Sequence, residues 1–197
     1  MSATASFLRP TATLVSPSRP VSAILLVLLA TLALAISAKL QVPFYPVPIT
    51  MQTYVVLFIG FAFGARLAAI TLLTYLLEGA LGFPVFAQSG GQTAGILYLL
   101  GPTGGYLAGF VLAAVVCGWC AERHWDRTPL GTATAALIGL VIIFACGLGW
   151  LGSVAGWDKP ILAWGLVPFL PGEVFKLGLL SATMPLAWRI RNKIAGG

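Results

Sequence analysis

The chain has 197 residues, of which 59% are hydrophobic and only 8% are charged. Soluble globular domains carry about 25% charged residues, so this composition excludes a soluble domain and indicates an all-α integral membrane protein. The net charge of +6 comes from scattered Lys and Arg residues. Because they form no basic patch, nucleic acid is not expected as a partner.

The N-terminal residues 1–20 contain Ser, Thr and three prolines, and we expect them to form a flexible cytoplasmic tail. An apolar run follows at 21–38. It ends in Ile36, Ser37 and Ala38, which resemble a signal-peptide cleavage site. However, five further apolar segments follow, so we expect this run to be retained as a membrane helix.

The five further apolar segments are separated by breaks rich in Pro and Gly. The segments lie at 49–64, 67–81, 104–121, 130–151 and 171–189. The intervening breaks of note are a Pro-rich stretch at 42–48, a charge-free loop at 82–103 and a connection at 157–170, for which a short re-entrant element is one interpretation. The pattern predicts a bundle of six transmembrane helices over residues 21–190, followed by a cytoplasmic tail at 191–197.

The basic residues indicate how this bundle is oriented. Two of them, Lys39 and Lys159, lie on one side of the predicted membrane, and Lys176 lies within a span. The other eight lie on the side of the termini: Arg9, Arg19, Arg66, Arg123, Arg127, Arg189, Arg191 and Lys193. Because Lys and Arg are enriched in cytoplasmic loops, both termini are expected in the cytoplasm of a multi-pass protein of the cell membrane.

Two charged residues interrupt the last apolar segment. Glu173 and Lys176 are three residues apart and therefore share a helix face. Because a charge at the centre of a membrane helix costs about 2.5–3.5 kcal/mol, such a pair is a functional-site hypothesis. Lys176 suits a ligand carboxylate, and Glu173 suits a ligand N–H group. The alternative is that both side chains snorkel to the nearby interface.

Other polar residues converge on the outer side of the predicted bundle. They are Thr50 and Gln52 in the second segment, Thr103 and Tyr106 in the fourth, and Gln88 and Gln92 in the long loop. Irregular backbone at membrane depth is tolerated where it lines a cavity. The pattern therefore predicts an outward-facing pocket for a small amphipathic ligand. The two loop glutamines are alternatively solvated surface residues.

Four stretches of the sequence stand out as motifs: PFYPVPITMQT at 43–53, LLEGALGFPVFA at 76–87, LLGPTGGYLAGF at 99–110 and PFLPGEVFK at 168–176. Together they resemble the BioY family, the substrate-binding S-components of biotin transporters of the energy-coupling factor (ECF) type. The resemblance covers residues 21–188 and implies a six-helix S-component fold with a biotin site near the outer face. In the family, the acid and lysine of the last motif are associated with biotin. This chain has Glu173 where the family usually has Asp.

The resemblance implies biotin uptake, in which the chain binds biotin from outside and delivers it inward. We expect the biotin carboxylate to meet Lys176 and the ureido group to bond to Gln52, Thr50 or Glu173. Aromatic side chains, among them Tyr45, Phe86 and Tyr106, are expected to contact the apolar ring and chain of the vitamin.

The resemblance also implies partners, namely a transmembrane coupling subunit and ABC-type ATPases, with a homo-oligomer as a further possibility and membrane lipid around the bundle. The sequence lacks the G-x-x-x-x-G-K-[ST] motif, so we expect no cofactor on this chain and ATP hydrolysis on its partners.

Three other functions are alternatives to biotin capture. The first is an S-component for another vitamin, such as riboflavin or thiamin, and the second is a proton-coupled secondary transporter that uses Glu78 and Glu173. An enzyme is not expected, because the single histidine, His124, lies in a cytoplasmic loop away from every outer serine. Cys117 and Cys120 lack the further ligands of a zinc site, and we expect both to be buried as small hydrophobic side chains.

Overall fold

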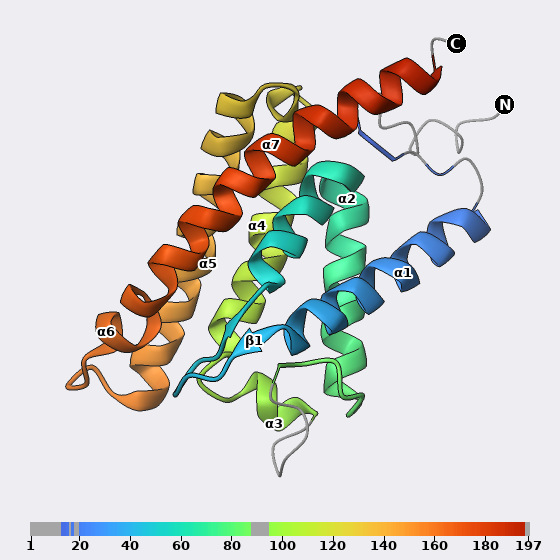
Figure 1. Ribbon diagram of the computed structural model, residues 1–197. Coiled ribbons are helices and arrows are strands. Elements are labelled where there is room, and N and C mark those ends of the chain that lie inside the picture. The colour runs from blue at the N-terminus through green and yellow to red at the C-terminus, as the bar shows by residue number, and fades with distance from the viewer. Residues whose placement is uncertain (1–12, 16, 18–19, 88–94, 196–197) are drawn as a thin grey trace, which may run out of the picture.

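The computed structural model describes residues 13–15, 17, 20–87 and 95–195. The described chain is mostly helical, and the long helices lie beside one another (Figure 1). In chain order the elements are α1 (Pro20–Lys39), β1 (Gln41–Val42), β2 (Ile49–Thr50), α2 (Gln52–Ala80), α3 (Ile96–Leu99), α4 (Gly104–Ala121), η2 (Trp125–Arg127), α5 (Pro129–Ala155), α6 (Ile161–Gly165), η3 (Val167–Phe169) and α7 (Leu170–Ala195).

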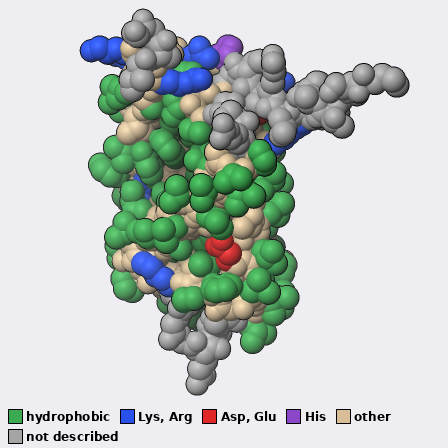
Figure 2. Space-filling model, turned by 90° about the vertical axis from the view of Figure 1, so that its right-hand side faces the viewer, with side chains coloured by type: hydrophobic (Ala, Val, Ile, Leu, Met, Phe, Trp, Pro, Cys, Tyr) green, Lys and Arg blue, Asp and Glu red, His purple; other side chains and the backbone are tan. Residues whose placement is uncertain are grey.

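Five segments of the described chain are long and apolar enough to cross a membrane, and the last of them runs from α6 through α7. Large hydrophobic side chains stay exposed along them, such as Leu25, Leu73 and Val174. Figure 2 shows this apolar surface between the two ends of the molecule. In water such an apolar surface would favour aggregation, whereas in a bilayer it contacts lipid tails of the same polarity.

Helix α2 is a helical hairpin that reverses at Gly64. This glycine has φ 76° and ψ 171°, a region of backbone conformation that is essentially restricted to glycine. In a straight helix, Gln52 and Tyr75 would be about 34 Å apart. Instead, Gln52 Nε2 lies 2.8 Å from the Tyr75 hydroxyl. Figure 1 shows the two arms of α2 running in opposite directions.

The turn at Gly64 fits against the end of α4. Glu122 Oε1 accepts a hydrogen bond from the Ala65 N–H at 2.9 Å, which satisfies one free donor at the start of the second arm. A carboxylate at a helix N-terminus is also favoured by the helix dipole. Gly118 permits the close approach, because a Cβ atom there would lie 2.4 Å from the Ala65 nitrogen.

Helix α4 is central in the bundle, between α2 and α5 (Figure 1). Glycines allow the close packing on both sides, with Gly60 facing Ala114 and Gly109 facing Ile143 at distances that leave no room for a Cβ atom. Helix α1 packs on the second arm of α2, where the Thr31 hydroxyl donates to Glu78 Oε1 at 3.0 Å. Small residues at helix contacts are typical of packing in lipid, where close van der Waals contact stabilises association.

The sequence predicted an all-α chain, and the structure adds a two-stranded ribbon. Strands β1 and β2 pair antiparallel, with Gln41 opposite Thr50. A strand of two residues is too short to show an alternation of apolar and polar residues, so the sequence pattern could not predict these two strands. The ribbon matters because it fixes Thr50 directly before α2.

The expected tails are partly ordered. Within the N-terminal tail, Thr13 is buried, and the Val15 N–H donates to the Ala62 carbonyl at 3.0 Å. Arg191 donates from Nη1 to the Thr13 carbonyl at 3.1 Å. The C-terminal tail expected at 191–197 is helical as far as Ala195. The described part of the N-terminal tail is therefore packed against the Gly64 end of the bundle, the end that also carries η2.

Asp126 joins η2 to α7 at this end. Its side chain is fully buried, and Oδ2 accepts a hydrogen bond from the Trp188 indole N–H. The guanidinium groups of Arg127 and Arg191 lie over the Trp188 ring, 4.2 Å and 4.9 Å from its centroid. Burial raises the pKa of the Asp126 carboxyl above its ordinary value, and the Trp188 hydrogen bond only partly opposes that shift.

We predict that Gly118→Ala destabilises the protein, because the new Cβ meets backbone atoms of Gly64 and Ala65 that cannot move aside. Overpacking of this kind costs about 1–3 kcal/mol. The measurement is the apparent melting temperature in detergent. Gly178→Ala is the matched control, because a Cβ there meets nothing within 4 Å. Equal melting temperatures for the two variants would contradict the hairpin contact.

A second prediction concerns pH. Because the pKa of Asp126 is raised in the folded state, its stabilising contribution is complete below the ordinary pKa and is lost as pH rises through the raised value. Asp126→Asn should therefore match the wild type in stability at acidic pH and exceed it progressively at higher pH. Melting curves across a pH series test this, and a difference that shrinks with rising pH would refute it.

Candidate ligand-binding site

A cavity opens at the end of the bundle opposite Gly64, where α6 lies. Polar lining groups come from the ribbon and the start of α2, namely Thr50, Gln52 and Thr53, and from Thr103 before α4 and Glu173 in α7. The cavity is small, with a volume of about 40 Å³. The site is therefore narrow in this conformation.

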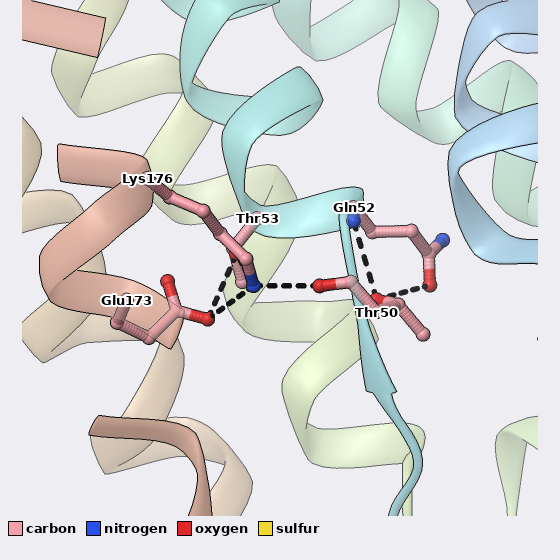
Figure 3. A network of polar contacts seen from close by, with 5 residues as sticks. All are labelled: Thr50, Gln52, Thr53, Glu173 and Lys176. Carbon is pink, nitrogen blue, oxygen red and sulfur yellow. Dashed lines mark hydrogen bonds and ion pairs between the residues drawn. The ribbon is translucent and has the colours of Figure 1, made fainter. Parts of the chain in front are cut away.

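The ion pair lies beside this cavity in the first turns of α7. Glu173 and Lys176 are 4% and 5% exposed, and their charged groups are 2.7 Å apart. Figure 3 shows the pair facing Thr50 and Thr53 across the gap between α7 and the start of α2. Both side chains thus point into the protein, which argues against snorkelling to the interface.

Every donor of Lys176 is used inside the protein. An ammonium group has three N–H donors, and Nζ lies 2.6 Å from the Thr50 carbonyl, 3.0 Å from Thr53 Oγ1 and 2.7 Å from Glu173 Oε1. Lys176 is absent from the cavity lining, whereas Glu173 is part of it. Glu173 therefore faces the cavity, and Lys176 contacts Glu173 from within the protein.

Glu173 keeps one free acceptor. Its Oε1 accepts from both Lys176 Nζ and the Thr53 hydroxyl, the latter at 2.9 Å. Its Oε2 is buried and has no hydrogen-bond partner among the described residues. A buried acceptor without a partner is costly. A ligand N–H group that enters the cavity can remove this cost.

The apolar wall of the cavity is an aromatic cluster. The Tyr106 ring stacks on Phe169 at 6.3 Å between centroids and meets Phe144 edge-on at 6.0 Å. The Tyr106 hydroxyl donates to the Gly165 carbonyl at 2.8 Å, which ties the wall to α6. Because this hydroxyl is already bonded, Tyr106 offers the cavity mainly its ring.

The structure brings together most of the site residues predicted from the sequence. Five of them line the cavity: Thr50, Gln52, Thr103, Tyr106 and Glu173. Lys176 does not line the cavity but contacts three lining residues, Thr50, Thr53 and Glu173. Gln88 and Gln92 lie outside the described residues.

Two predicted aromatic contacts do not line the cavity. Tyr45 is 84% exposed in the turn between β1 and β2. Phe86 is buried, but its ring packs between Tyr75 and Tyr98, with centroids 5.5 Å and 4.8 Å away. Position in the sequence placed both residues at the correct end, but only the fold decides which way a loop side chain points.

Several lining residues were not predicted as site residues. Thr53, one position after Gln52, bonds both members of the ion pair. Phe169 lies within the last motif, and its position four residues before Glu173 on the same side of the chain was a usable signal. Phe144 lies in the middle of an apolar helix, where nothing in the sequence distinguishes it from lipid-facing residues.

The comparisons with known proteins agree with this architecture. The model of the BioY family matches residues 9–193. The chain belongs to the BioY family. Five segments of its described residues are long and apolar enough to cross a membrane, and it is therefore a multi-pass protein of the cell membrane.

Curated relatives in this family match most of the chain. A probable biotin transporter BioY of Rickettsia prowazekii (strain Madrid E) is 30% identical over 171 residues, which cover 85% of this chain and 84% of the relative. The biotin transporter BioY of Thermotoga maritima (strain ATCC 43589 / DSM 3109 / JCM 10099 / NBRC 100826 / MSB8) is 35% identical over 147 residues, or 75% of this chain and 84% of the relative.

A solved structure shares the fold. The crystal structure of the S-component for biotin from an ECF-type ABC transporter superposes with a TM-score of 0.72 at 22% identity, over 87% of this chain and 92% of that chain. At this identity the likeness concerns the fold, so the chemistry of the site has to be argued from this chain's own residues.

We predict that Lys176→Met lowers stability, because it leaves the buried Glu173 carboxylate without its counter-charge. Removing one partner of a buried pair costs about 3–5 kcal/mol, whereas replacing both is often neutral. The double variant Glu173→Gln/Lys176→Met should therefore regain much of the loss in melting temperature.

Lys159→Met is the matched control for this prediction. It breaks the ion pair of Lys159 with Asp158, whose side chains are 49% and 72% exposed, and exposed pairs contribute little. A loss for Lys176→Met no larger than for Lys159→Met would show that the buried pair is not coupled as described.

Proposed function

We propose that this protein captures biotin from the outer side of the membrane as the substrate-binding subunit of an ECF-type transporter. The observation that carries the proposal is that Glu173, which lines an aromatic-walled cavity, has a buried Oε2 without a hydrogen-bond partner among the described residues. Biotin combines an apolar bicyclic core with a ureido group that carries two N–H donors. Membership of the BioY family and the names of the relatives support the same ligand.

In this proposal the ureido group faces Glu173. A ligand N–H donates to Glu173 Oε2, and the apolar rings lie against Tyr106, Phe144 and Phe169. The ligand carboxylate points away from Glu173, because like charges repel strongly in a low-dielectric site.

Lys176 has a different role here from the one expected from the sequence. A contact with the biotin carboxylate would require it to give up one of its three internal hydrogen bonds. We therefore assign Lys176 a positioning role, in which it supplies the counter-charge of Glu173 and occupies Oε1 with a hydrogen bond.

We infer that each arm of α2 crosses the membrane, so that the bundle has six spans over residues 21–190. The first arm, Gln52–Phe63, covers only about 18 Å. The irregular chain before it continues at membrane depth, and Val47 and Pro48 line the cavity. Such backbone is tolerated in a bilayer where it lines a cavity.

The distribution of charge supports cytoplasmic termini. Basic residues gather at the Gly64 end in the loops and helix ends that carry Arg66, Arg123, Arg127, Arg189 and Arg191. Figure 2 shows Lys and Arg side chains concentrated towards one end of the apolar surface. Because cytoplasmic loops are rich in Lys and Arg, the Gly64 end faces the cytoplasm and the cavity faces outward. Residues 1–20 and 191–197 then lie on the cytoplasmic side.

Delivery requires partners. The fold match is to a subunit of an ECF-type ABC transporter, and the sequence has no P-loop motif for ATP. We propose that a transmembrane coupling subunit and ABC-type ATPases supply the energy, so that this chain needs no cofactor of its own. The narrow cavity fits a cycle in which the walls move when the ligand is admitted.

The proposal predicts tight biotin binding to the purified protein in detergent, measured by calorimetry. Glu173→Gln should weaken binding at least tenfold, or about 1.4 kcal/mol, because the amide offers a donor or a weaker neutral acceptor where the ligand needs a charged acceptor. Binding is measured below the melting temperature of the variant, since the substitution also alters the ion pair.

Asp158→Asn is the control, the same chemical change at an exposed acid. Failure of a folded, monodisperse wild type to bind biotin would overturn the proposal and direct the search to riboflavin, thiamin and other vitamins. Uptake that continues without any ATPase and stops with an uncoupler would favour a proton-coupled transporter instead.

A further inference from the structure

Three consecutive backbone carbonyls after α2 are each held by a side chain from a different element. The Tyr75 hydroxyl donates to the Val85 carbonyl at 2.9 Å, Lys39 Nζ to the Phe86 carbonyl at 2.7 Å, and Gln41 Nε2 to the Ala87 carbonyl at 3.3 Å. These donors come from α2, α1 and β1. The segment 85–87 is thus fastened to the bundle, and Ala87 lines the cavity.

One of the three donors also reaches the ligand-binding cavity. Tyr75 is fully buried, and its hydroxyl accepts a hydrogen bond from Gln52 Nε2 at 2.8 Å. Gln52 lines the cavity, whereas Tyr75 does not. A continuous chain of hydrogen bonds therefore runs from the cavity through Gln52 and Tyr75 to Val85.

The direction of each bond in this chain follows from chemistry. The Val85 carbonyl can only accept, so the single hydroxyl proton of Tyr75 is committed to it. The Tyr75 oxygen then acts as the acceptor for the NH₂ group of Gln52. Glutamine O and N atoms are otherwise hard to distinguish, but this partner fixes which way the amide faces.

With its NH₂ group turned towards Tyr75, Gln52 turns Oε1 towards Thr50, whose hydroxyl donates to it at 3.4 Å and leaves one lone pair of this oxygen for a further donor. Figure 3 shows the Gln52 amide beside Thr50, with Thr53 and the ion pair across from it. Gln52 and Glu173 both line the cavity, so Gln52 Oε1 and Glu173 Oε2 are two candidate acceptors on described lining residues. A cyclic urea, which carries two N–H donors, matches two such acceptors.

We propose that Tyr75 is a positioning residue for ligand recognition. It fixes which way the amide of the lining residue Gln52 faces, with Nε2 on Tyr75 and Oε1 on the side of Thr50, and it ties that amide to the segment 85–87. This inference rests on the proposed biotin function. Tyr75 itself does not touch the ligand, so its effect passes entirely through Gln52.

The test is a double-mutant cycle on biotin affinity with Tyr75→Phe and Gln52→Leu. Tyr75→Phe removes only the hydroxyl and keeps the ring that packs edge-on against Phe86. Each single variant should weaken biotin about tenfold. In the Gln52→Leu background, the further change to Phe should cost little, because the group that Tyr75 positions is already gone.

Tyr54→Phe is the matched control, since its hydroxyl joins Thr183 at 3.2 Å outside the cavity lining. It should leave biotin affinity unchanged. Independent, additive losses from Gln52 and Tyr75 would overturn the inference, because they indicate a merely structural role for Tyr75. Wild-type affinity in Tyr75→Phe would overturn it as well.

Two further outcomes are informative. If the wild type itself does not bind biotin, the proposed function fails and the inference fails with it. If Tyr75→Phe is not monodisperse, Gln52→Leu is measured alone, and unchanged biotin affinity in that variant overturns the inference.

Discussion

The site depends on a lysine whose charge is fully satisfied inside the protein. An ammonium group taken out of water loses a large hydration energy, and only good acceptors in a fixed geometry compensate for it. Here the acceptors come from the ribbon, the start of α2 and α7. Lys176 therefore cross-links three segments at membrane depth. The same arrangement uses up one oxygen of Glu173 and leaves the other free.

The helical hairpin at Gly64 makes this arrangement possible. Because α2 reverses there, its two ends return to the same side of the bundle. The first end supplies Gln52 and Thr53, and the second arm supplies Tyr75. A glycine at one end of the protein, in a conformation that other residues avoid, thus sets the polar geometry at the other end. The Glu122 contact with Ala65 fixes the turn from outside.

The sequence predicted the helical segments well, because long apolar runs separated by Pro and Gly are a strong and local signal. It also identified Glu173 and Lys176, since charges in an apolar segment are conspicuous. It could not assign their roles. Whether Lys176 faces a ligand or is saturated by neighbours depends on the carbonyl of Thr50, a backbone group 126 positions away that no side-chain pattern encodes. Tyr45 and Phe86 show the same limit for loop side chains.

The cavity combines a rigid polar side with an apolar side built from aromatic rings. On the polar side, Glu173 is held by its hydrogen bond to the charged Lys176, and Gln52 is held by the chain of hydrogen bonds through Tyr75. Moving either acceptor would therefore break several hydrogen bonds at once. On the apolar side, Tyr106, Phe144 and Phe169 contact one another mainly through ring faces and edges, which can slide at lower cost. A ligand larger than the present cavity would therefore displace the aromatic wall before the polar frame. In the proposed function, the polar frame would recognise the N–H donors of the ligand, and the wall would adapt to its volume.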